Sequence, residues 1–143
     1  MWKRNKSKET VSGKNDFAGH VKKLSEGLYY ISETDAAILP FVGAKAQAVS
    51  KSEILRQTKS AVDAPVEERV FGEIFARLTK IQDWFGDEEK ETAAKYIKLR
   101  DFLEKNLKDL KVFKVGSIQL KVYFVGLDSE GRLMGIKTEA VET

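Results

Sequence analysis

The apolar positions in the second half of the chain change from helical to strand spacing. From Val112 onward, residues 112–115 begin a strand, and apolar residues alternate with others over 118–125. Met134, Ile136, Thr138 and Ala140 then line one face of a final strand. This period predicts strands, and Asp128–Gly131 has the composition of a turn. We therefore expect a three-stranded antiparallel meander. Before it, residues Asp87–Leu110 predict one amphipathic helix, with an apolar stripe of Ala93, Tyr96, Leu99, Leu103, Leu107 and Leu110.

The first half of the chain predicts shorter elements. Phe17, Val21 and Leu24 have the spacing of one helix face, and Gly27 is suited to end that helix. Helices preceding a run of strands, with one early strand, predict an α+β domain with helices packed on a sheet. The remaining expectations are a strand at 28–31, a turn at 32–35, a strand then a loop over 38–49, a helix at 52–57, a connection at 63–65 and helical spacing over 66–79.

Composition narrows the class of protein. The chain has 143 residues, no cysteine and a single histidine, His20. One domain of ordinary size fits this length. Disulfides, zinc ribbons, thiol catalysis and a two-histidine metal site within one chain are excluded. No apolar run approaches membrane-spanning length, and the first residues lack the apolar region of a secretory signal. We expect a cytoplasmic protein without a membrane contact.

The net charge of +3 comes entirely from the first residues. Residues 1–16 carry five basic and two acidic side chains, whereas residues 17–143 carry twenty of each. This predicts a basic, disordered tail at 1–16 and a neutral folded domain at 17–143. The tail is interpreted as a solvated terminus, and a basic arm that touches nucleic acid is the alternative.

Three features place polar or aromatic side chains at the ends of predicted elements. Glu33 follows a strand, and Asp83 and Trp84 lie in a polar connection. The Trp84 indole either covers the core or is an exposed anchor of an interface. Thr143 comes just after the last predicted strand, and we expect an ionised α-carboxylate there at neutral pH.

Other candidates have structural interpretations. The chain has no phosphate-binding glycine loop, nucleophile elbow or metal-ligand spacing. His20 lies at the edge of the first helix's apolar stripe, as a partly buried structural histidine does. Asp87–Glu89 form the first turn of the long helix, where the helix dipole favours negative charge.

An ordered set of short segments resembles the nuclease A inhibitor family, whose founding member inhibits a cyanobacterial sugar-nonspecific endonuclease. The resemblance covers residues 17–143, diverges at 34–50 and leaves 1–16 as an extension. No single segment is diagnostic, but their order and the shared ending are specific. The segments are Ser25–Leu28, Ser32–Glu33, Asp63–Pro65, Gln82–Trp84, Asp87–Glu89, Asn106–Lys108, Val122–Tyr123, Gly135–Ile136 and Val141–Thr143.

The resemblance implies a three-layer α/β/α sandwich of the PR-1-like type. With His20 alone, the two-histidine, two-acid cleft of secreted PR-1-like proteins is absent. The resemblance also implies a non-enzymatic, monomeric inhibitor with no cofactor or metal of its own. Such an inhibitor binds a DNA/RNA non-specific ββα-metal endonuclease one to one. Glu33, Asp83, Trp84 and Thr143 are the positions that the resemblance assigns to contacts with the nuclease.

The hypothesis that follows is local mimicry of a phosphodiester. Carboxylate oxygens suit Mg²⁺, so Glu33 and the Thr143 carboxylate are expected to face the target's metal site. Asp83 would pair with a cation of the nuclease, and Trp84 would supply an anchor.

Other functions stay open at this point. One is a binding module of the same fold with a different protein partner or a nucleic-acid partner. Another is a small hydrolase using Glu33 with Asp83, although the sequence offers no nucleophile for it.

Overall fold

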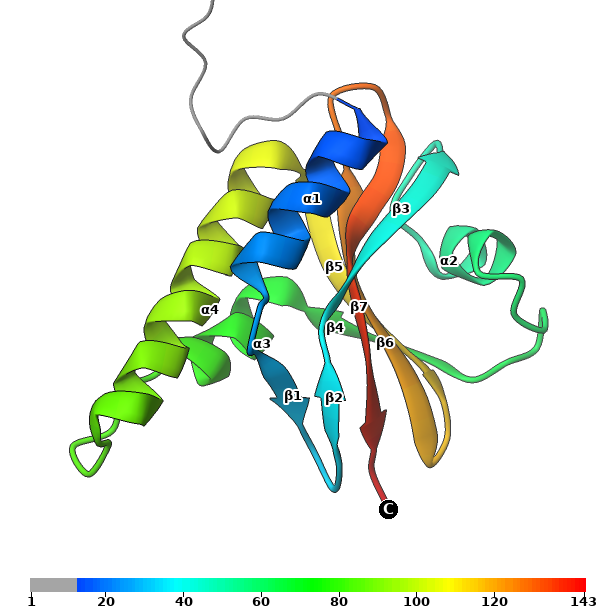
Figure 1. Ribbon diagram of the computed structural model, residues 1–143. Helices are drawn as coiled ribbons and strands as arrows, with labels where there is room; N and C mark the ends of the chain where they lie inside the picture. Colours follow the sequence, from blue (N-terminus) through cyan, green and yellow to red (C-terminus); the bar gives the residue numbers. More distant parts are fainter. Residues whose placement is uncertain (1–12) are drawn as a thin grey trace, which may run out of the picture.

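The computed structural model describes residues 13–143, so most of the predicted tail at 1–16 lies outside the described residues. The predicted boundary at residue 17 falls inside the first helix, which begins at Lys14. Four helices and seven strands follow one another along the chain (Figure 1). In order they are α1 Lys14–Leu24, β1 Tyr29–Ile31, β2 Asp35–Ala37, β3 Leu39–Lys45, α2 Lys51–Gln57, β4 Val66–Val70, α3 Phe71–Thr79, α4 Asp87–Asn106, β5 Lys108–Gly116, β6 Gln119–Leu127 and β7 Arg132–Val141.

Five strands form one antiparallel sheet in the order β3-β7-β6-β5-β4. The predicted meander is confirmed as β5-β6-β7, and β6 pairs with β7 from Gln119↔Val141 to Leu127↔Leu133. Strands β1 and β2 form a separate hairpin, which lies beside the end of β7 (Figure 1).

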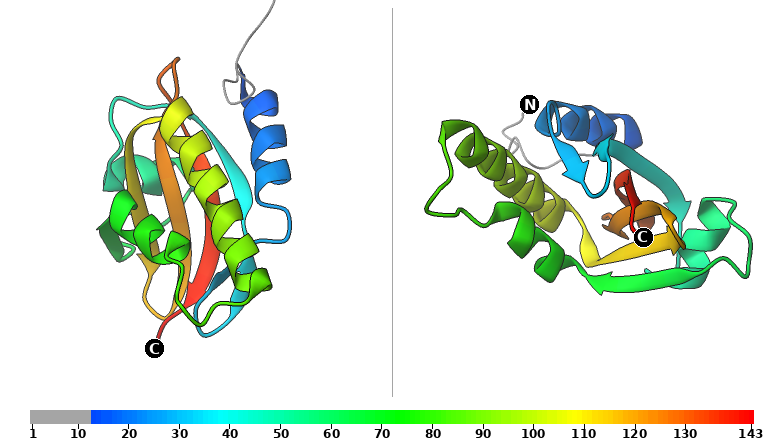
Figure 2. Two further views of the ribbon diagram at one scale, coloured as in Figure 1. Left: turned by 90° about the vertical axis from the view of Figure 1, so that its left-hand side faces the viewer. Right: turned by 90° about the horizontal axis from the view of Figure 1, so that it is seen from below.

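Alternating side chains of the sheet build two cores, one on each face. Val122 and Phe124 of β6 pack under α1, α3 and α4, whereas Tyr123 and Val125 pack on the opposite face with Ile54 of α2. Figure 2 shows three helices over one face and the short α2 over the other. The predicted α+β class is confirmed, while the assignment to the PR-1-like sandwich stays a prediction.

Two predicted helix boundaries are wrong. Residues 66–70 form β4, because Glu67 and its neighbours pair along the edge of β5; only residues 71–79 are helical. The long helix ends at Asn106, where Leu107 turns to an extended conformation with φ −129°. Leu110, assigned by its spacing to the helix stripe, lies in β5 and packs against the same core.

The early strand predictions are confirmed at 29–31 and 39–45, although β2 was not predicted. Pro40 lies inside β3 without ending it. Because β3 is an edge strand of the sheet, the missing proline N–H need not break the ladder.

Two glycine substitutions are expected to have opposite effects on stability. A Cβ at Gly135 of β7 would collide with the backbone carbonyl of Phe124 on β6, whereas one at Gly19 of α1 would meet nothing within 4 Å. Gly135→Ala should therefore lower the free energy of unfolding by about 1–3 kcal/mol. Gly19→Ala should raise it by about 0.5–1 kcal/mol, because alanine favours helix. Urea unfolding measures both, and equal effects would contradict the close approach of β6 and β7.

Candidate functional site

Glu33 and Thr143, which are 110 positions apart in the sequence, are brought together at one end of the molecule. Oε2 of Glu33 accepts hydrogen bonds from the backbone N–H of Thr143 at 2.7 Å and from its Oγ1 at 2.8 Å. Figure 1 shows the tip of the β1–β2 hairpin and the end of the chain at the lower end of the sheet. Two of the four predicted contact residues thus form one site.

The turn between β1 and β2 holds this arrangement in place. Ser32 Oγ accepts a hydrogen bond from the Val141 N–H at 3.0 Å, and the Glu33 N–H donates to the Val141 carbonyl at 3.2 Å. Ser32 Oγ also donates to the Thr34 carbonyl at 3.2 Å, within the turn itself. The tip of the hairpin is therefore fastened to the end of β7, which sets the position of the Glu33 carboxylate.

The Thr143 backbone N–H, followed by its hydroxyl, lowers the pKa of the Glu33 carboxyl below its ordinary value of 4.5. Hydrogen bonds to an ionised carboxylate favour the charged form. Glu33 is exposed to solvent, so desolvation opposes this effect only slightly. The site therefore presents a fixed negative charge at neutral pH.

A hollow of 420 Å³ adjoins Glu33 and Thr143 and contains charges that sequence analysis missed. The side chain of Lys114 in β5 is only 7% exposed, and its Nζ lies 2.9 Å from the Glu142 carboxylate. Arg69 and Arg77 line the same hollow. A signal for Lys114 was present in the sequence, because it shares the core-facing side of its strand with Val112.

Asp83 and Trp84 lie in the connection between α3 and α4, at the same end of the molecule. A turn closed by the Phe85 N–H and the Gln82 carbonyl, at 3.1 Å, contains both residues. Trp84 is 74% exposed, and its indole meets the Phe85 ring edge-on at 4.7 Å. Trp84 is therefore exposed to solvent and does not cover the core.

The structure does not bring this pair into contact with Glu33 and Thr143 within the described residues. Seen from below, the β1–β2 hairpin lies between the α3–α4 connection and the chain end (Figure 2). A second hollow of 560 Å³ lies between the hairpin and this connection. Its lining residues include Tyr29 and Ile31 of β1, Phe85 of the connection and Tyr96 of α4. Ile31 and Arg77 line both hollows, so the two adjoin.

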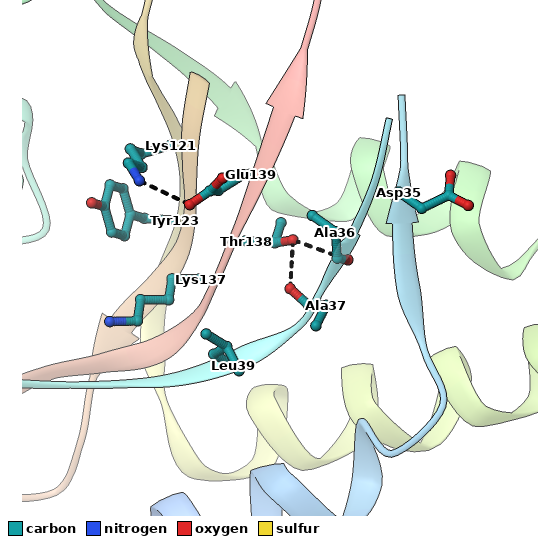
Figure 3. A pocket seen from close by; sticks show the side chains of 9 residues that line it. All are labelled: Asp35, Ala36, Ala37, Leu39, Lys121, Tyr123, Lys137, Thr138 and Glu139. Atoms are coloured by element: carbon teal, nitrogen blue, oxygen red, sulfur yellow. Dashed lines mark hydrogen bonds and ion pairs between the residues drawn. The ribbon is translucent and has the colours of Figure 1, made fainter. Parts of the chain in front are cut away.

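A third hollow, of 480 Å³, lies between β2 and the strands β6 and β7 (Figure 3). Three of its polar side chains have partners within the protein: Lys121 Nζ lies 2.8 Å from the Glu139 carboxylate, and Thr138 Oγ1 donates to the Ala37 carbonyl at 2.9 Å. None of the four predicted contact residues lines it.

The residues interpreted as structural have the expected surroundings. The His20 ring stacks on Phe102 with centroids 5.4 Å apart, and the Glu89 carboxylate accepts from the Gly86 N–H at the start of α4. Across residues 13–143, no three histidine or carboxylate side chains gather into a group suited to a metal ion. Over the same range no helix is long and apolar enough to cross a bilayer.

A comparison with protein-family models found a match that covers nearly the whole folded domain. A family model described as nuclease A inhibitor-like protein matches residues 15–143. The matched range contains every strand of the sheet and all four predicted contact residues. A search of curated proteins found no match.

The pKa of Glu33 provides a test of its contact with Thr143. Because the folded-state pKa is lowered, this contact stabilises the fold above the ordinary value of 4.5 and is lost as the pH falls through the lowered pKa. In an NMR titration, the Glu33 carboxyl should titrate below 4.5 and the Thr143 amide shift should follow it. Thr143→Val should move the midpoint upward, since it removes one donor and keeps the N–H. A Thr143 amide that does not respond to Glu33 would contradict the contact.

Proposed function

Because the chain belongs to the family of nuclease A inhibitor-like proteins, we propose that it inhibits a DNA/RNA non-specific endonuclease of the ββα-metal type by covering its active site. Membership of this family indicates a nuclease inhibitor in general, and hence a non-enzymatic protein with a nuclease as its partner. The type of nuclease and the way in which it is blocked are our proposal. The observation that carries it is the convergence of Glu33 and Thr143 in one exposed site.

The two oxygens of the Glu33 carboxylate have different tasks in this proposal. Oε2 is occupied by the Thr143 N–H and hydroxyl, whereas Oε1 has no hydrogen-bond donor among the described residues. Oε1 is therefore available to the Mg²⁺ site of the target, for which carboxylate oxygen is a suitable ligand. Thr143 lies beside it and faces the same metal site. The fixed, ionised carboxylate would stand in for the scissile phosphate.

Asp83 and Trp84 extend the contact on the other side of the hairpin. Large exposed aromatic side chains are characteristic anchors of protein interfaces, because their burial removes much apolar area from water. Trp84 has this exposure, and apart from its edge-on contact with Phe85 its ring pairs with no other described aromatic ring. In the complex, Trp84 would fill a pocket of the nuclease and Asp83 would pair with one of its cationic side chains.

The scaffold suits local mimicry better than imitation of a whole duplex. Residues 17–143 are neutral overall, whereas imitation of a whole duplex calls for a strongly acidic protein. The sheet with helices on both faces also fits the PR-1-like sandwich that we propose for the fold. We further propose a cytoplasmic monomer that acts in a one-to-one complex without a cofactor.

Inhibition of a purified ββα-metal non-specific endonuclease tests the proposal. The intact chain at equimolar concentration should abolish plasmid degradation. Glu33→Gln and Trp84→Ala should each raise the inhibition constant about 30-fold or more, as expected for a central charge or aromatic anchor. Glu130→Gln and Val62→Ala are matched controls: Glu130 lies in the β6–β7 turn at the opposite end, and Val62 is a fully exposed apolar residue. Equal inhibition by all four variants would reject this site.

The nucleic-acid alternative makes a separate prediction. If the basic first residues bind nucleic acid, the intact chain should bind a duplex oligonucleotide with a steep salt dependence. Deletion of residues 1–12 should then abolish that binding. The inhibitor proposal expects the same deletion to leave nuclease inhibition unchanged. Fluorescence anisotropy and the nuclease assay on the two proteins separate these outcomes.

A further inference from the structure

Arg77 stands where the two hollows meet. It lies in the last turn of α3, its side chain is exposed, and it lines both the hollow beside Glu33 and Thr143 and the hollow beside Phe85. Ile31 is the other residue that lines both. Arg77 is therefore located between the two halves of the proposed inhibitory surface.

In the hollow beside Glu33 and Thr143, the other charged side chains have partners within the described part of the protein, and Arg77 does not. Beside Glu33 and Thr143, Lys114 pairs with Glu142 at 2.9 Å and Arg69 pairs with Glu67 at 3.3 Å. The Glu33 carboxylate is held by Thr143. Within residues 13–143, neither an ion pair nor a hydrogen bond engages the Arg77 guanidinium. Of the charged side chains that line this hollow, Arg77 is the one left without a protein partner.

We propose that Arg77 binds a carboxylate side chain of the partner nuclease and thereby helps to determine which nuclease is inhibited. This inference rests on the proposed function and deepens it. A guanidinium offers two parallel N–H donors to a carboxylate, which fixes orientation as well as charge. Ile31 and Tyr29, which are 73% and 53% exposed, flank the site and would exclude water from the pair once the surfaces meet.

The surroundings favour a protein carboxylate over a nucleic-acid phosphate. Nucleic-acid backbones are held by several unpaired cations acting together. In the hollow beside Glu33 the neighbouring cations are paired with carboxylates, and Glu33 and Glu142 would repel a phosphate. The other hollow contains Lys80 and Lys95 but also three acidic side chains, those of Glu88, Glu89 and Glu91. A guanidinium beside exposed aromatic and aliphatic side chains instead has the composition of a protein interface, in which aromatic residues and arginine are enriched.

Arg77 could instead have a purely structural role as a cation at the end of α3, and a lysine at this position would preserve that role. A cation in the last turn of a helix interacts favourably with the helix dipole. Lysine retains that charge but not the planar pair of donors. Arg77→Lys should therefore melt at the same temperature as the intact chain and still bind the nuclease more weakly.

The experiment measures inhibition of a purified ββα-metal non-specific endonuclease by the full chain and its variants. We expect Arg77→Gln to raise the inhibition constant about 30-fold or more and Arg77→Glu to raise it further. Arg77→Lys should fall between Arg77→Gln and the intact chain. Arg56→Gln is the matched control, because Arg56 is an exposed arginine on α2, on the opposite face of the sheet. Combining Arg77→Gln with Asp→Asn and Glu→Gln variants around the nuclease's metal site should reveal one non-additive pair.

Each other outcome contradicts the inference. If the intact chain inhibits and Arg77→Gln inhibits equally well, the carboxylate contact is wrong while the proposed function stands. Full inhibition by Arg77→Lys would overturn the bidentate pair. Duplex binding by the intact chain that is lost in Arg77→Gln would assign Arg77 to phosphate. If the intact chain inhibits no such nuclease, the proposed function fails and this inference fails with it.

Discussion

The pairing of strand β7 along both of its edges is the constraint on which the rest of the structure depends. β7 joins β6 over its whole length and β3 over most of its first half, so it carries side chains of both cores. At Gly135 the backbone of β7 approaches the Phe124 carbonyl so closely that no Cβ fits. A slip of one residue would exchange the two faces of the strand and would also move Val141 and Thr143 away from the hairpin.

The candidate site depends on this register more than on any local motif. Glu33 is placed by a three-residue turn, but the turn is oriented by its bonds to Val141 and Thr143. The buried Lys114 of β5 forms an ion pair with Glu142, the residue that follows β7. Removing Glu142 would leave the buried Lys114 ammonium without its countercharge. The end of β7 is thus held from two directions, which gives the Glu33 carboxylate a defined position before any partner arrives.

At the end of the molecule that contains Glu33 and Thr143, individual charged groups matter more than the net charge of the domain. The folded part of the chain is neutral, and most charges around the site are paired within the protein. The groups that have no partner here within the described residues include one oxygen of Glu33 and the guanidinium of Arg77, with the exposed Ile31 beside the same hollow. Opposite charges separated by apolar groups define an orientation, and orientation gives specificity more than affinity.

The sequence by itself determined the features that repeat over a few residues: the meander, most of α4, the first helix and the α+β class, because apolar spacing reflects local geometry. It also indicated Glu33, Asp83, Trp84 and Thr143 as candidates, partly through family resemblance. Tertiary structure decided what depends on distant neighbours. Residues 66–70 form a strand because they pair with the edge of β5. Leu110, which its spacing assigned to the helix, lies in β5 of the same sheet. The meeting of Glu33 with Thr143, and of Arg77 with both hollows, required the whole fold, since no local pattern encodes contacts between segments far apart in the chain.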